Sequence, residues 1–66
     1  MFSWTVNGSP KWAKESSMEA VLDAVSQVND NCVIKIKELD EKGGAIAEWE
    51  LGKKTKDGFR KLNRVL

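Results

Sequence analysis

The sequence predicts a small α+β domain in which one amphipathic helix packs on one face of an antiparallel sheet of three to five strands. Three patterns support this: period-two alternation at residues 1–6 and again within 32–51, and a helical period at 18–28. Strands that flank a single helix in so short a chain are typical of a two-layer fold. We therefore expect one domain, residues 1–66, with the order β-(β)-α-β-β followed by a last strand or a short helix.

Residues 1–6 alternate large apolar with small polar side chains, which is typical of a strand with one buried face. Asn7-Gly8 follows and favours a type I′ hairpin turn, which needs positive φ at both central residues. Residues 9–13 are then the return strand. Pro10 has no backbone donor, so that strand is expected at an edge of the sheet. The alternative is an irregular connection into the helix.

The helix is predicted to begin at a capping box formed by Ser16 and Glu19, whose side chains can each accept a hydrogen bond from a free backbone N–H. Apolar residues then follow at steps of three or four, on one helical face: Met18, Val21, Leu22, Val25 and Val28. Asp30-Asn31 is expected to end the helix, because Asn tolerates the left-handed conformation found there.

Residues 32–51 predict a hairpin with one apolar and one charged face. The loop is Glu41 to Gly44, and Leu39 is placed opposite Ile46. A slip of one residue would bury four charges, so the register is well specified. The central pairs in this register are Ile34 with Leu51, Lys35 with Glu50, Ile36 with Trp49, and Lys37 with Glu48.

The last segment supports two interpretations. In the first, residues 56–58 form a three-residue hairpin loop, Thr55 pairs with Phe59, and Trp49 lies opposite Val65. This register also sets Lys53 opposite Lys61 and Lys54 opposite Arg60, which is unfavourable unless an anion binds there. In the second, a short terminal helix presents apolar residues at helical spacing: Phe59, Leu62, Val65 and Leu66.

Catalysis and metal binding are not expected. The chain has no histidine, which is the side chain best suited to proton transfer near neutral pH and the commonest transition-metal ligand. Its only cysteine, Cys32, is predicted to be a small buried apolar side chain. A chain of 66 residues has little material to enclose a small-molecule pocket. We therefore predict no enzyme activity, no catalytic residues, no metal and no cofactor.

The single cysteine also indicates the cellular compartment. A small secreted domain usually needs disulfides, so a reducing cytoplasm is the expected compartment. The sequence contains no signal-peptide pattern and no apolar stretch long enough to span a bilayer. We expect a soluble protein that does not bind membranes.

Charge is unevenly distributed along the chain although the net charge is only +1. Cations dominate residues 53–64, and a basic segment with an aromatic residue can grip phosphates and stack on a base. Nucleic-acid binding is therefore the alternative function. The residues assigned to it are Lys53, Lys54, Lys56, Phe59, Arg60, Lys61 and Arg64.

Tryptophan content favours a protein partner. Trp12 follows Lys11 and has no clear burial partner in the sequence, so it either packs at the start of the helix or is exposed. An exposed tryptophan beside a lysine is typical of protein interfaces. Partner binding is assigned to Trp4, Trp12 and Lys11, with an open edge strand as a second contact or as the interface of a homodimer.

These observations favour a small non-enzymatic binding or regulatory module that acts by occupying a macromolecular partner, in the first place a protein. In size and element order the chain resembles the short helix-on-sheet proteins of bacteria and their phages, such as accessory or inhibitor proteins. No motif supports a closer assignment.

Overall fold

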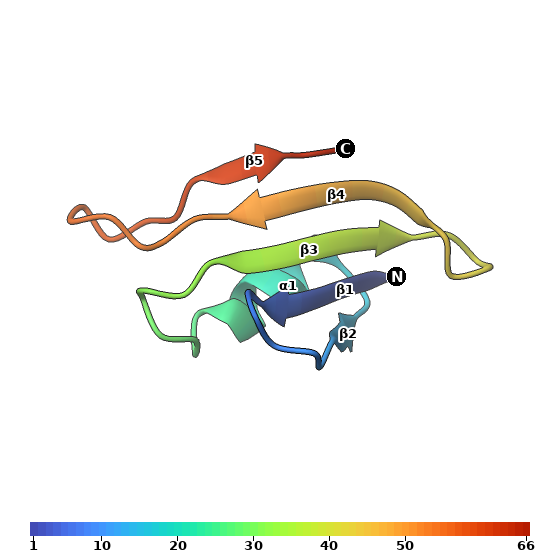
Figure 1. Ribbon diagram of the computed structural model, residues 1–66, viewed down its shortest axis with the longest axis horizontal. Helices are drawn as coiled ribbons and strands as arrows, with labels where there is room; N and C mark the ends of the chain where they lie inside the picture. The colour runs from blue at the N-terminus through green and yellow to red at the C-terminus, as the bar shows by residue number, and fades with distance from the viewer.

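The computed structural model describes residues 1–66 and contains a five-stranded antiparallel sheet with one helix on one face (Figure 1). The sheet order is β2-β1-β3-β4-β5, which confirms the predicted two-layer α+β fold. The helix is neither long nor apolar enough to cross a membrane. The elements are β1 (Phe2–Val6), β2 (Ala13–Glu15), α1 (Met18–Val25), β3 (Ile34–Leu39), β4 (Ala45–Leu51) and β5 (Leu62–Arg64).

The core lies between α1 and the centre of the sheet. Val21 and Val25 of the helix pack against Ile34, Ile36 and Leu51, and Figure 1 shows α1 behind β1 and β3. Burying each such side chain contributes about 1.5–3 kcal/mol to stability. Partly buried residues surround this cluster: Phe2, Trp4, Val6, Met18, Val28 and Trp49.

The first hairpin forms, but with a different turn and a shorter return strand than predicted. The N–H of Ser9 donates to the carbonyl of Val6 across 2.9 Å, and Gly8 has a φ of +90°. No non-glycine residue has positive φ, so the turn has the φ signs of type II instead of type I′. The return strand begins only at Ala13, because the chain around Pro10 does not enter the ladder. It is an edge strand, as predicted.

The helix begins and ends differently from the prediction. Ser17, not Ser16, is the N-cap, and its hydroxyl accepts a 3.1 Å hydrogen bond from the N–H of Ala20. The regular helix ends at Val25. Val28 still reaches the core through a tighter turn, in which its N–H donates to the carbonyl of Val25 across 2.8 Å.

The second hairpin has the predicted register over its central pairs and departs from it only near the loop. A bulge between Glu38 and Leu39 pairs Leu39 with Ala45 instead of Ile46. The carboxylate of Asp40 causes the difference, since it accepts hydrogen bonds of 2.9 and 2.8 Å from two backbone N–H groups of the loop. The tighter loop leaves Ile46 54% exposed.

The C-terminal segment forms a strand, not a helix. The N–H of Thr55 donates to the carbonyl of Phe59 across 2.9 Å, which agrees with the predicted loop. Further along, however, the pairing is offset by one residue, and Trp49 lies opposite Arg64 instead of Val65. Lys61 consequently lies beside Gly52, whose N–H donates to the Lys61 carbonyl across 3.0 Å, instead of opposite Lys53.

Candidate binding surface

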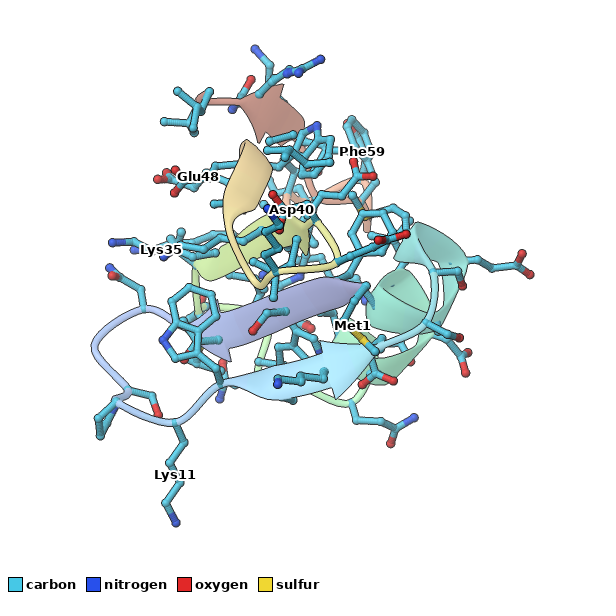
Figure 2. All side chains as sticks on the ribbon, turned by 90° about the vertical axis from the view of Figure 1, so that its right-hand side faces the viewer. Met1, Lys11, Lys35, Asp40, Glu48 and Phe59 are labelled. Atoms are coloured by element: carbon cyan, nitrogen blue, oxygen red, sulfur yellow. The ribbon has the colours of Figure 1, made fainter.

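The sheet face opposite α1 has no helix or second sheet packed on it and is buried only over β1, at Ser3 and Thr5; we call it the open face. Figure 2 shows Lys35 and Glu48 extending from this face while the helix lies on the other side. The strand registers assign its remaining side chains: Ser3, Thr5, Lys14, Lys37, Glu50 and Asn63, with Trp12 beyond β1 and Val65 beyond β4.

Trp12 is held on the open face by the loop that precedes β2. The hydroxyl of Thr5, a residue only 4% exposed, donates to the carbonyl of Lys11 and so fixes the chain next to Trp12. Trp12 is 40% exposed, and the ammonium nitrogen of Lys37 lies 4.7 Å from the centroid of its ring. Such a cation–π contact contributes about 0.5–1 kcal/mol at an exposed site.

A shallow groove of about 260 Å³ extends across the open face from Trp12 to Val65. Between these two residues it is lined by the charged side chains of β3 and β4: Lys35, Lys37, Glu48 and Glu50. Small-molecule sites are usually enclosed cavities of roughly 300–1,000 Å³. The groove is smaller and more open than such a cavity.

The charged side chains on the open face lie opposite one another but form no ion pairs within the sheet. Lys35 faces Glu50 and Lys37 faces Glu48 in the strand register, as predicted. The only ion pair within 4.0 Å is elsewhere, between Lys54 and Asp30 at 3.7 Å. Because the Lys37 ammonium lies over Trp12, Glu48 has no cationic partner.

Trp4 and Trp12 lie on opposite faces of the sheet, so the structure does not bring them together. Trp4 packs against the core on the helix side, and its indole N–H donates a 3.1 Å hydrogen bond to the carboxylate of Glu15. Lys11 is exposed, and Figure 2 shows its side chain extending away from the sheet.

The basic segment forms a second exposed surface. Phe59 is 58% exposed, and Figure 2 shows it on the side of the sheet away from Lys35. Lys54 is held by its contact with Asp30, whose carbonyl also accepts the Lys54 N–H across 2.8 Å. The other exposed lysines of this segment are Lys53, Lys56 and Lys61.

The two arginines of the basic segment are engaged with the protein itself. The Arg60 guanidinium donates to the carbonyls of Asn29 at 2.7 Å and Gly52 at 3.0 Å, and also to that of Cys32. Cys32 precedes β3 and is only half-buried, whereas the sequence predicts a buried side chain at the start of the strand. The Arg64 guanidinium lies 5.9 Å from the centroid of the Trp49 ring.

Sequence reasoning did not include the charged side chains of β3 and β4, or Val65, in the predicted site. One signal points to them. Trp12 has the same period-two phase as Lys14, and strand alternation therefore assigns both to the face that carries the predicted lysine–glutamate pairs. The exposure of Val65, 66%, depends on the one-residue offset of β5 and has no sequence signal.

No group of three or more His, Cys, Asp or Glu side chains is arranged to hold a metal ion. No protein-family model, curated protein or solved structure matches this chain. The two exposed surfaces are therefore the features of the molecule that bear on its function.

Proposed function

We propose that this protein is a non-enzymatic binding module that acts by occupying another protein, which it contacts with the open face. The observation that carries the proposal is the 40% exposure of Trp12 at one end of the groove. Tryptophan is among the residues that contribute most to protein interfaces, since it brings a large apolar surface together with a polar N–H. The unpaired cysteine supports action in a reducing compartment such as the cytoplasm.

The charges beside Trp12 suit a protein partner. A surface with columns of both signs is complementary only to a partner with the reverse arrangement, so it favours specific partners over general polyanions. Lys11 extends away from the sheet and adds long-range attraction for an acidic region of the partner.

The test is to compare Trp12→Ala with the wild type in partner capture and in thermal unfolding. Trp12 lies outside the core, so we expect capture of the partner to fall at least tenfold while the melting temperature falls by only about 2–8 °C, the effect of losing the contact with Lys37 and a smaller drop than Trp4→Ala should cause. Trp4→Ala is the matched control, because Trp4 packs against the core and its loss is expected to lower the melting temperature. Equal capture by wild type and Trp12→Ala would contradict the proposal.

Nucleic-acid binding by the β4–β5 hairpin is the second candidate, and the exposed Phe59 ring among lysines supports it. Aromatic side chains can stack on bases, and lysines neutralise phosphates. Arg60 and Arg64 already contact the protein itself, so we assign this function to Lys53, Lys56 and Lys61 with Phe59.

A single-stranded thymidine oligonucleotide tests the second candidate by fluorescence anisotropy. Neutralisation of three phosphates on a single strand predicts an affinity that falls roughly 20-fold between 50 and 200 mM salt. The double variant Lys53→Glu/Lys56→Glu should abolish binding, and Lys42→Glu, in the other hairpin loop, should retain most of it. Absence of binding at 50 mM salt, or binding insensitive to salt, would remove this candidate.

A further inference from the structure

We propose that the partner of the open face is a second copy of this chain, bound face to face about a two-fold axis parallel to β3 and β4. This inference rests on the proposed function, which makes the open face a protein-binding surface. It identifies the partner from the arrangement of charge.

The charges form two parallel columns on neighbouring strands. Lys35 and Lys37 lie on β3, and Glu48 and Glu50 lie beside them on β4. Neighbouring strands are about 4.8 Å apart, so the two columns are close together and of opposite sign. Since neither glutamate has a cation within 4.0 Å, both can accept an ion pair from another molecule.

Two-fold symmetry converts these columns into a self-complementary surface. In a face-to-face pair, an axis parallel to the strands and midway between β3 and β4 places β3 of each copy over β4 of the other. Lys35 of one copy then faces Glu50 of the other, and Lys37 faces Glu48, because these residues share rows in the strand register. An axis perpendicular to the strands would place lysine over lysine, so charge selects the first arrangement.

The same two-fold axis also brings together the residues at the two ends of the groove. Trp12 lies beyond β1, on one side of the two charge columns, and Val65 lies on the other side, where its N–H donates to the carbonyl of Glu48 across 2.8 Å. The two-fold axis therefore brings Trp12 of each copy toward Val65 of the other. Val65 is 66% exposed, and contact between the two would shield apolar surface at both ends of the interface.

The area of the open face determines how tightly two copies are expected to bind. Five strands of three to seven residues, each about 10–23 Å long and about 4.8 Å from its neighbour, present on the order of 400 Å² per copy, which belongs to the class of small, weak interfaces. We therefore expect dissociation in the micromolar range. Pairing through an edge strand is less favourable, because β2 and β5 each contain three residues and provide few ladder hydrogen bonds.

Charge reversal with sedimentation analysis of the full chain tests the dimer. We expect Lys35→Glu/Lys37→Glu and Glu48→Lys/Glu50→Lys each to raise the dimer dissociation constant at least tenfold. An equimolar mixture of these two variants should associate at least as tightly as the wild type, because one copy now presents only acids and the other only bases. Mixing two variants does not restore contacts within either chain. Recovery of association in the mixture therefore shows that these charges lie in an interface between chains.

Salt provides a measurement that does not depend on the variants folding. The wild-type dissociation constant should rise at least fivefold between 50 and 500 mM NaCl, since the exposed pairs are screened. A monomeric wild type at 500 μM, a dimer insensitive to salt, or a variant mixture that does not associate would overturn the dimer. A monomer that still captures a different protein through Trp12 would overturn the dimer and leave the proposed function standing; loss of both would reject both.

Discussion

The guanidinium of Arg60 donates a hydrogen bond of 2.7 Å to the carbonyl oxygen of Asn29, which is 31 residues earlier in the chain. The same group donates to Gly52 and Cys32, so a single side chain connects the loop after α1, the entry to β3 and the end of β4. Carbonyl groups in such connections need donors, and here one planar cation supplies them.

We predict that Arg60→Ala lowers the free energy of unfolding by about 2–4 kcal/mol, because it removes charge-assisted hydrogen bonds to three carbonyl groups. Chemical denaturation monitored by tryptophan fluorescence measures the change. Lys61→Ala is the matched control and should change stability by less than about 0.5 kcal/mol, since Lys61 is exposed and forms no ion pair. Equal effects of the two substitutions would mean that the Arg60 contacts do not stabilise the fold.

The choice between two adjacent serines gives a second prediction. Only the Ser17 hydroxyl caps α1, so Ser17→Ala should cost about 0.5–2 kcal/mol of stability, and Ser16→Ala should cost much less. Thermal unfolding followed by circular dichroism compares the two variants directly. A larger loss for Ser16→Ala would mean that the helix begins one residue earlier than the structure shows.

Alanine substitutions at two glycines of the β4–β5 hairpin should change the stability of the protein in opposite directions. Gly58 has a φ of +87°, where an L side chain costs about 1–2 kcal/mol, so Gly58→Ala should destabilise the protein. Gly52 has no such φ, and an added Cβ would meet the Lys61 carbonyl at an ordinary 3.8 Å. Gly52→Ala should therefore be neutral or stabilise by up to about 1 kcal/mol, since it restricts the unfolded chain. Denaturant midpoints of the two variants test this, and a shift of both in the same direction would contradict it.

The central hairpin could be predicted because two independent constraints, apolar alternation and opposite charges in facing rows, agree on one register. Its loop could not, because the bulge before Leu39 depends on the hydrogen bonds that the Asp40 carboxylate makes. The one-residue offset of β5 likewise accompanies contacts that Arg60 makes with residues distant in sequence, which no local pattern encodes.

The candidate surface was predictable in part. Sequence reasoning singled out Trp12, but whether its ring is exposed depends on the Thr5–Lys11 hydrogen bond and on the approach of Lys37. Residue type alone groups Trp4 with Trp12, although period-two alternation in β1 places Trp4 with Phe2 and Val6 on the core side. Residue type therefore indicates that an interface exists. The alternation of side chains along each strand determines which of them lie on the same face of the sheet.

The local charge around Trp12 gives a last prediction. Collisional quenchers reach exposed tryptophan first, and Trp12 is 40% exposed, whereas Trp4 and Trp49 are packed against the core. Because the Lys37 ammonium lies over the Trp12 ring, the anion iodide should quench fluorescence more strongly than the cation caesium at equal ionic strength. Trp12→Phe should remove most of this difference, and Lys37→Gln should reduce it while Trp12 stays accessible to neutral acrylamide. If iodide exceeds caesium with the wild type by no more than it does with free tryptophan, Trp12 does not lie beside Lys37 in solution, and the charged surroundings on which the binding proposals depend are absent.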